Sequence, residues 1–461
     1  MSSSSSAPVD REALAARLSA RANLPPHGAL HYVNSFAFGD RQVARYTLRN
    51  GLKLLLLLDD GAKVVSYHTW FGVGSRHEQP GKTGLAHLFE HLMFNETRNL
   101  PAGEFDRTLE AAGGEVNAAT WVDWTFYYEN VPSSELGLVV RLEAERMQHL
   151  VLREPQVTSE KEVVANERRY RVEDDVEGAV NELLYKTAFQ RHPYHWPTIG
   201  WMEDIQAFTT GDCERFYAAY YAPNNATIVV VGDFDEEATL AALQEHYGVI
   251  ASSAMPAHQF EAEPAQTEER VLELEKPTPT EKLSLGYKSP ALGDADYSVL
   301  TVLNEVLTGG RSSRLYRTLV SERELASEVR GSASPTRDPG LYELWVSLRE
   351  GHRAEQALAV VDEILAQIAA QGVLPSELEK AKNRLELGFL HGMESASGKA
   401  EQLGFYETVL GDAARVFDQL EAYRRVSAQD VQQLARTRLT PAQRTTLLVR
   451  PSEDASDEAA E

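Results

Sequence analysis

One order of predicted elements occurs twice along the chain, and this repetition constrains the fold more than any other feature. The elements of the first half are strands at 45–51, 52–58 and 64–73, helices at 84–95 and 104–112, a hairpin at 115–120 and 124–130, helices at 134–151, 156–174 and 178–189, and a closing strand at 227–231. Those of the second half are strands at 271–274 and 282–287, helices at 295–308 and 314–322, a strand at 341–348, helices at 353–371 and 375–392, and a closing strand at 445–449. The shared order predicts an internal duplication of one α+β unit.

The segments outside and between these halves have a different composition. Residues 1–30 begin with a serine run and are predicted to form a flexible N-terminal arm, whereas residues 451–461 are predicted to form a disordered acidic tail. Residues 251–268 contain proline and alanine without a helical or strand period, which is typical of a linker. The predicted domains are therefore 31–250 and 269–450.

Charge and cysteine content exclude several classes of protein. The chain of 461 residues has 69 acidic and 45 basic side chains and a formal net charge of −24. We expect no nucleic-acid partner, because affinity for nucleic acid comes mostly from Lys and Arg on phosphates. Cys213 is the single cysteine, so no intrachain disulfide and no cysteine-based zinc site can form, and we expect it to pack within a helix. Any metal must be held by His, Asp or Glu.

Apolar runs are short throughout the chain. The longest, such as 54–58 and 216–222, fall far below the ~20 residues that span a bilayer, so the sequence predicts no membrane span. The N-terminal residues show neither the basic region nor the apolar region of a secretory signal. We therefore expect a cytoplasmic protein, or a periplasmic one if a signal peptide has been removed.

The sharpest chemical signal is the run His87-Leu88-Phe89-Glu90-His91, which has the H-x-x-E-H spacing of inverted zincins. On a helix, His87, Glu90 and His91 share one face, because residues three and four apart lie one turn above each other. Two imidazoles one turn apart can bind a single Zn²⁺. A glutamate between them can reach a water on the metal. Two ordinary histidines on an amphipathic helix would give the same pattern, so the motif alone leaves both interpretations open.

A third ligand would have to come from elsewhere in the chain, because catalytic zinc usually has three protein ligands and one open position. Glu160 and Glu167 lie seven residues apart in one predicted helix, and therefore on the same face. Carboxylates beside Val163 and Val164 are unusual in a buried stripe unless a cation neutralises them. A solvated acidic helix face is the alternative.

Several motifs together resemble those of the pitrilysin-type (inverzincin) zinc metallopeptidases, a family that includes short bacterial peptidases and processing-peptidase subunits. The motifs are Gly72-Val73-Gly74-Ser75-Arg76, the H-x-x-E-H run, Glu160 to Arg168 with Glu167, Gly114-Glu115-Val116-Asn117-Ala118, His192 to Ile205, and Tyr221 to Ala226. The resemblance spans most of the chain. It implies an α+β fold of two homologous domains, each a mostly antiparallel sheet backed by helices, which is half of the clamshell that longer members form.

The resemblance also implies roles for individual residues. The side chains that correspond to the ligands of one Zn²⁺ per chain are His87, His91 and Glu167. Glu90 corresponds to the catalytic base, which accepts a proton from the attacking water. Glu160 corresponds to a second acidic residue that orients a ligand. Asn117 and Ala118 lie on the strand to whose edge substrates add in extended form.

The second half departs from the family pattern. Members usually carry an Arg and, seven residues later, a Tyr, which hydrogen-bond the substrate and the oxyanion from the far side of the cavity. With Leu319 and Leu325 fixing the register, Val320 stands at the Arg position and Ser327 at the Tyr position. Valine cannot donate a hydrogen bond and serine is too short to replace a phenol, so we predict that the pair is lost. We therefore expect a heterodimer whose homologous partner supplies the Arg and the Tyr.

The expected function is a zinc-dependent endopeptidase subunit that hydrolyses short or unfolded peptides inside a cavity closed by a second subunit. One alternative is a processing peptidase that removes targeting presequences. The other is a non-catalytic structural subunit of the same fold, as in the family's respiratory-complex core proteins. Those proteins tend to have degraded metal motifs, whereas the residues in question are all intact here: His87, Glu90, His91 and Glu167.

Overall fold

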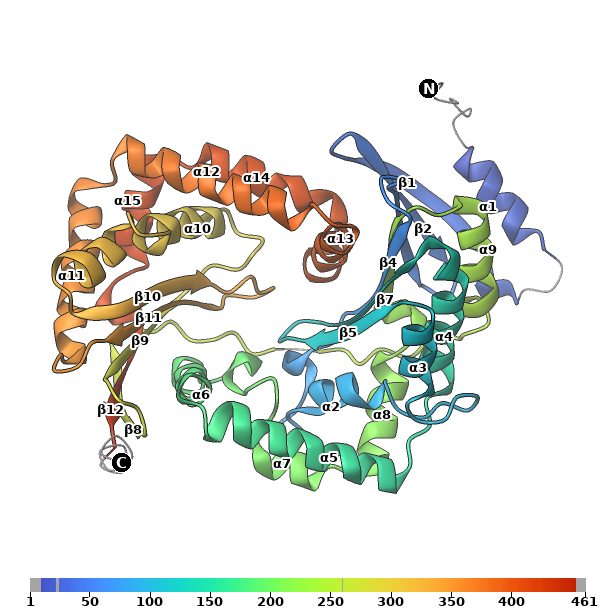
Figure 1. Cartoon of the computed structure of the whole chain (residues 1–461), viewed down its shortest axis with the longest axis horizontal. Coiled ribbons are helices and arrows are strands. Elements are labelled where there is room, and N and C mark those ends of the chain that lie inside the picture. Colours follow the sequence, from blue (N-terminus) through green and yellow to red (C-terminus); the bar gives the residue numbers. More distant parts are fainter. Residues whose placement is uncertain (1–9, 22–24, 259, 453–461) are drawn as a thin grey trace.

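The computed structural model describes residues 10–21, 25–258 and 260–452, and it shows two lobes, each built on one sheet (Figure 1). The first sheet consists of β1 (Leu30–Phe38), β2 (Arg41–Leu48), β3 (Lys53–Leu58), β4 (Val64–Phe71), β5 (Glu115–Thr120), β6 (Thr125–Pro132) and β7 (Ala226–Gly232). The second sheet consists of β8 (Arg270–Lys276), β9 (Lys282–Lys288), β10 (Ala326–Ala333), β11 (Leu341–Leu348) and β12 (Arg444–Pro451).

Helices pack on both sheets. In the first half of the chain they are α1 (Arg11–Ser19), α2 (Leu85–Leu92), α3 (Glu104–Ala111), α4 (Leu136–His149), α5 (Glu154–Arg168), α6 (Val176–Ala188), α7 (Met202–Ala207), α8 (Thr210–Tyr220) and α9 (Glu236–Tyr247). In the second half they are α10 (Ala295–Thr308), α11 (Ala354–Gln371), α12 (Pro375–Gly392), α13 (Ala396–Leu410), α14 (Val416–Arg425) and α15 (Ala428–Thr437). Two π-helical segments are η4 (Arg169–Glu173) and η7 (Tyr316–Glu322).

Five strands of each sheet have the same spatial order. The order is β3-β7-β4-β6-β5 in the first sheet and β8-β12-β9-β11-β10 in the second, and the first sheet continues into β2 and β1 beyond β3. In both sheets the first of these pairs is parallel and the others are antiparallel. The predicted fold class, two homologous α+β domains with mostly antiparallel sheets, is therefore confirmed.

One helix from each half crosses to the sheet of the other half. Helix α6 contributes Val180 and Leu184 to a cluster with Leu341 and Leu447 of the second sheet. Helix α13 contributes Ala400, Leu403 and Tyr406 to a cluster with Trp70 and Val229 of the first sheet. Figure 1 shows α13 beside β4 and α6 beside the second sheet. Each lobe thus completes the hydrophobic core of the other.

The predicted flexible arm at 1–30 is wrong for its described part. Asp10 caps α1, and Leu14, Ala15 and Leu18 are buried in the core of the first lobe. Arg11 also pairs with Glu236 of α9 at 2.8 Å. The apolar face of this helix is short, with only three buried positions. The pattern of apolar residues is therefore too weak to indicate a helix next to the serine-rich start of the chain. Residues 1–9 and 22–24 lie outside the described residues.

Other departures from the sequence-based prediction occur in both halves, and in the first half β1, α7 and α9 were not predicted. The pattern at 314–322 predicts an α-helix, but the structure has the wider π-helical segment η7. Strand β10 and helices α13 to α15 were not indicated by the sequence pattern. The described residues between α9 and β8 contain no helix or strand. Of the predicted acidic tail, Pro451 ends β12, and residues 453–461 lie outside the described residues.

Two smaller expectations can also be compared with the structure. Cys213 of α8 is fully buried in the core of the first lobe, which confirms its packing role. Among the described helices, none alone has the length and apolar character to cross a membrane. Helices α11 and α12 meet that criterion only as a pair, across a bend of 110°.

Candidate metal centre

Helix α2 carries the H-x-x-E-H run and begins at a buried cap. Gly84 precedes the helix at a φ of 96°, and a Cβ there would lie 2.5 Å from the carbonyl oxygen of Ile199, so only glycine fits. The carboxylate of Glu78 accepts hydrogen bonds from the backbone N–H groups of Gly84 (2.8 Å) and Ala86 (2.7 Å). Apolar side chains anchor the opposite face of the helix in the core: Leu85, Leu88, Phe89 and Leu92. The polar face is thereby directed towards α5 and β5.

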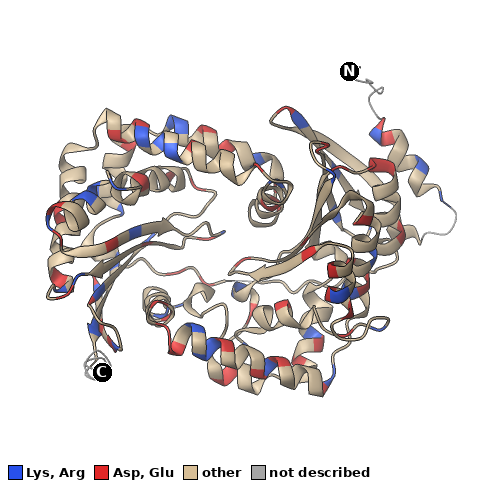
Figure 2. Cartoon of the chain, viewed as in Figure 1, with Lys and Arg blue, Asp and Glu red and all other residues tan. Residues whose placement is uncertain are grey.

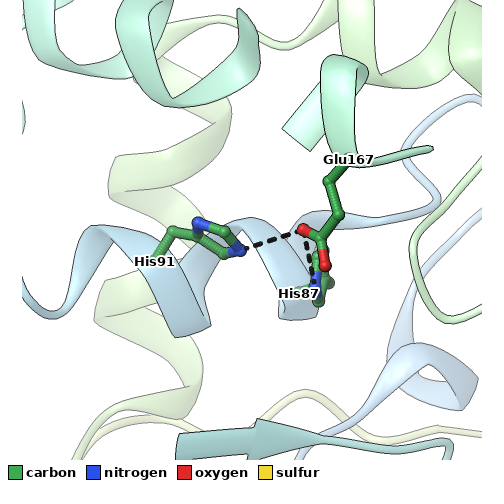
Figure 3. Close-up of side chains that lie close together, drawn as sticks. All are labelled: His87, His91 and Glu167. Carbon is green, nitrogen blue, oxygen red and sulfur yellow. Dashed lines mark ion pairs between the residues drawn. The ribbon is translucent and has the colours of Figure 1, made fainter. Parts of the chain in front are cut away.

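His87, His91 and Glu167 converge at one point between α2 and α5 (Figure 3). Glu167 Oε2 lies 3.6 Å from His87 Nε2 and 3.4 Å from His91 Nε2, and one ligand atom of each residue lies within 4.8 Å of the others. Ligand atoms bound at ~2.0–2.1 Å to a tetrahedral ion are about 3.3 Å apart. Glu167 Oε2 is buried and has no hydrogen-bond partner among the described residues. These three side chains therefore fit the Zn²⁺ that the resemblance implies.

Glu160 lies behind His91 rather than with the three converging residues. Its Oε2 is 3.6 Å from His91 Nδ1, the ring nitrogen that faces away from Glu167. Its Oε1 accepts a hydrogen bond of 3.1 Å from the side chain of Asn95. A carboxylate at Nδ1 orients the imidazole and favours the tautomer whose Nε2 can bind a metal.

The two histidines have opposite electrostatic environments. Burial lowers the pKa of His87 to about 4, so this imidazole is neutral and ready to act as a ligand. Burial also disfavours charge on His91, but Glu160 and Glu167 outweigh it and raise the pKa of His91 to about 9. The proximity of His91 lowers the pKa of Glu167. Without a metal, His91 and Glu167 are therefore an ion pair, and a bound cation would replace the proton on Nε2 of His91.

The side chain of Glu90 lines a cavity of about 570 Å³ between the lobes. The side chain is half-buried, and burial raises the pKa of Glu90 above its usual range. The cavity lining includes His87 and Glu167, the aromatic side chains of Trp121 and Trp196, and Glu343 from the second sheet. A carboxylate with a raised pKa facing such a cavity is suited to proton transfer near neutral pH.

Strand β5 forms one wall of this cavity and is the last strand of the first sheet. Asn117 and Ala118 both line the cavity, and Asn117 is exposed. In the described part of the chain, β5 pairs with one strand only, β6, so its other edge can pair with an extended peptide. The predicted base and the predicted substrate strand therefore face the same space.

Val320 and Ser327 lie away from the residues that line the cavity. Val320, in η7, packs against the core of the second lobe. Ser327, on β10, is exposed and donates a hydrogen bond of 3.3 Å to the carbonyl oxygen of Ser347. Neither residue belongs to the described lining.

Two residues of the site have no place in the sequence-based prediction. Glu78 caps the N-terminus of α2 from six residues upstream, and no sequence pattern marks such a long-range cap. Arg171 pairs with Glu167 at 3.1 Å, and the i,i+4 spacing of an acid and a base on one helix could have indicated it.

Charges are distributed differently on the outer helices and in the cavity. Figure 2 shows acidic and basic residues mixed along outer helices such as α5 and α12. The described cavity lining has one basic side chain, Arg171, and four acidic ones: Glu90, Glu167, Glu182 and Glu343. The cavity therefore shares the acidic character of the chain as a whole, whose formal net charge is −24.

Comparisons with known proteins identify related chains. The family model described as Insulinase (Peptidase family M16) matches residues 54–200, and the model described as Peptidase M16 inactive domain matches residues 207–385. The first match contains the converging residues, and the second contains Val320 and Ser327. Zinc protease PqqE of Helicobacter pylori is 32% identical over 410 residues, which are 88% of this chain and 92% of that protein.

Solved structures show the same architecture. The crystal structure of a protease from Helicobacter pylori is 31% identical, with a TM-score of 0.86 over 89% of this chain and 100% of that one. The periplasmic protease PqqL from Escherichia coli, 19% identical with a TM-score of 0.74, matches 92% of this chain but only 49% of its own, so at the level of the fold this chain corresponds to half of it. The chain therefore belongs to the M16, or pitrilysin-type, family of peptidases.

Proposed function

We propose that this chain is the catalytic subunit of a zinc-dependent endopeptidase that hydrolyses short or unfolded peptides. The observation that carries the proposal is the shared cavity, because the two predicted ligands His87 and Glu167, the predicted base Glu90 and the edge of β5 all line it. The third predicted ligand, His91, completes the converging set beside it. The name of the Helicobacter pylori relative, a zinc protease, supports the same chemistry.

The chain's own residues account for the steps of hydrolysis. A Zn²⁺ bound by His87, His91 and Glu167 would polarise a peptide carbonyl and lower the pKa of a water. The edge of β5 holds the substrate backbone in extended form, which favours unfolded peptides over folded proteins. Glu90 accepts the proton of the attacking water and delivers it to the leaving amine. Glu160 keeps the ring of His91 in place.

We further propose that a homologous second subunit closes the cavity. The tetrahedral oxyanion needs hydrogen-bond donors, and the loss of one such donor typically costs ~2.7–4 kcal/mol in the barrier. Val320 and Ser327 stand where the family resemblance places donors, and neither side chain can replace them. The match to only half of PqqL is consistent with a protein that needs a second copy of the fold.

Reconstitution tests the proposal. The purified, zinc-loaded chain should hydrolyse unstructured peptides weakly by itself and strongly after addition of a homologous subunit that carries the Arg and the Tyr. Val320→Arg combined with Ser327→Tyr should raise the activity of a homodimer of this chain, because each copy would then supply the donors to the other. Robust hydrolysis by the unmodified chain, in a preparation shown free of any homologous subunit, would contradict the heterodimer.

A processing peptidase for targeting presequences would use the same site, and profiling with presequence and unrelated peptides separates the two. A structural subunit would bind no stoichiometric zinc. The converging ligand set favours an enzyme over that alternative.

A further inference from the structure

Arg171 occupies a distinctive position beside the metal centre. It is the single lysine or arginine among the described residues that line the cavity. Its side chain is 68% exposed, whereas that of Glu167 is 18% exposed. The Nε atom of Arg171, in η4, lies 3.1 Å from Oε1 of Glu167, four residues earlier in the last turn of α5. Among the described residues, this ion pair with Glu167 is the one charged contact of the Arg171 guanidinium.

The two oxygens of Glu167 have different partners. Oε1 faces Arg171, whereas Oε2 faces the Nε2 atoms of His87 and His91 and has no hydrogen-bond partner in the described part of the chain. A carboxylate can bind a metal through one oxygen or through both. Catalytic zinc needs three protein ligand atoms and one open position, so binding through both oxygens would crowd the place of water or substrate. The ion pair with Arg171 keeps Oε1 of Glu167 turned away from the two histidines.

The backbone explains why Arg171 reaches Glu167 from the cavity side. Helix α5 ends at Arg168 and continues directly into the π-helical segment η4, which is closed by a hydrogen bond of 2.8 Å from the N–H of Asp174 to the carbonyl oxygen of Arg169. A π turn is wider than an α turn, so it changes the directions of the side chains that follow the ligand, and such turns are frequent at functional sites.

We propose that Arg171 is a positioning residue for the metal centre. By holding Oε1, it directs Oε2 towards His87 and His91, so that Glu167 binds through a single oxygen and the fourth position stays open. This inference rests on the proposed function, because it requires a metal at the three converging side chains. Arg suits this role because its planar guanidinium can hold one carboxylate oxygen in a fixed direction, which the ammonium of Lys does less well.

The same turn provides a matched control. Arg169 is exposed, lies two residues before Arg171, and donates a hydrogen bond of 2.6 Å from its guanidinium to Asn166 Oδ1. It does not belong to the described cavity lining. Arg169→Gln therefore removes the same charge from the same turn without removing the contact with Glu167. The side chains of Arg171 and Arg169 are both exposed, and ion pairs and hydrogen bonds of exposed side chains contribute little to folding, so both variants should fold.

The experiment measures Zn²⁺ affinity by chelator competition for the wild type, Arg171→Gln, Arg171→Lys and Arg169→Gln. We expect Arg171→Gln to weaken zinc binding by about 10–100-fold, as is typical for partners of a metal ligand. Arg171→Lys should lose less, and Arg169→Gln should stay close to the wild type. Co²⁺-substituted protein provides a second readout, because its visible absorption falls when coordination changes from four to five. We expect that fall in Arg171→Gln alone.

The outcomes separate this inference from the proposed function. If the wild type binds zinc and Arg171→Gln binds it equally well with an unchanged Co²⁺ spectrum, the positioning role is refuted and the proposed function is unaffected. If Arg169→Gln loses as much affinity as Arg171→Gln, the effect is one of overall charge and the positioning role is again refuted. A wild-type chain that binds no zinc would overturn the proposed function, and this inference with it.

Discussion

Five strands of each lobe share one spatial order, but among the described residues only the first lobe carries a candidate metal centre. Helix α2 follows β4 in the first lobe and presents two histidines and a glutamate, whereas α10 follows β9 at the corresponding place in the second lobe and contains no histidine. Both helices bury apolar faces, through Leu88 and Phe89 in α2 and through Leu300 and Leu303 in α10. The difference teaches that buried faces maintain the fold, while a few side chains on the opposite face decide the chemistry.

The two helices that cross between the lobes are also held differently. On α13, Glu407 is 3% exposed in its side chain and pairs with Lys53 (2.8 Å) and Arg45 (3.2 Å) of the first sheet. On α6, the hydroxyl of Tyr185 donates a hydrogen bond of 2.8 Å to a carboxylate oxygen of Glu343 in the second sheet, and the exposed side chain of Glu177 pairs with Arg330 of β10. A buried carboxylate therefore joins α13 to its sheet, whereas the ion pair of α6 is exposed to solvent.

The largest expected effect is the loss of the metal centre, which is the chemical feature that distinguishes the first lobe from the second. His87→Ala, His91→Ala or Glu167→Gln leaves two protein ligands, too few for a stable catalytic site, so each variant should lose stoichiometric zinc and peptidase activity. Glu160→Gln should lose about 10–100-fold in affinity or activity. Metal content of the purified variants checks this. If Glu160→Gln lost zinc while Glu167→Gln retained it, the two roles would be reversed.

The next effect separates catalysis from metal binding. Glu90→Gln keeps the size of the side chain but cannot accept a proton, so hydrolysis should fall by at least ~10²-fold while zinc is retained. The matched control is Glu305→Gln in α10, where Glu305 accepts a hydrogen bond of 2.7 Å from Arg384 and does not belong to the described cavity lining. Peptide hydrolysis by the zinc-loaded variants is the measurement, and full activity of Glu90→Gln would contradict its role as the base.

A smaller effect on the free energy of unfolding is expected from tighter packing at the contacts of the two crossing helices, α13 and α6. A Cβ on Gly404 of α13 would lie 2.0 Å from Nε1 of Trp70, which is 1% exposed, whereas a Cβ on Gly286 of β9 would lie 3.0 Å from the side chain of Leu184 on α6. Gly404→Ala should lower the free energy of unfolding by about 2 kcal/mol, since overpacking a core typically costs about 1–3 kcal/mol. Gly286→Ala should change it by less than about 1 kcal/mol, because the Leu184 side chain can move. Urea denaturation measures both, and equal effects would show that the two contacts are equally rigid.

The smallest effect, counted per pH unit, is a pH dependence of stability at the contact between α13 and the first sheet. Burial lowers the pKa of His68 to about 3, and its Nε2 lies 3.5 Å from the hydroxyl of Ser397 in the first turn of α13. Between pH ~6.5 and 3, His68 is protonated in the unfolded chain but neutral in the folded chain. As the pH falls through this range, His68 therefore lowers the free energy of unfolding by about 1.4 kcal/mol per pH unit. His68→Gln should make unfolding less pH-dependent in this range. His31→Gln, at an exposed position of β1, is the control for loss of an imidazole.

The sequence predicted much of the fold because most elements have a clear apolar period. The helix at 375–392 and the strand at 341–348 have the predicted bounds, and the closing strands at 227–231 and 445–449 lie within β7 and β12. Strand β10 was missed because its buried positions, Ala326 and Val329, do not alternate as a strand period requires. A single-sequence pattern also cannot distinguish the π-helical segment η7 from an α-helix, because both have similar apolar spacing.

The sequence by itself determined the residue types and helical spacings of the candidate site, because His87, Glu90 and His91 are neighbours on one helix face and Glu160 and Glu167 on another. Only the tertiary structure decided that these two faces meet, that Glu78 caps α2, and that α6 and α13 cross to the opposite sheets. The physical reason is that local periodicity records which face of an element is buried but not which partner covers it. That partner can be hundreds of residues away, as Arg45 and Glu407 are.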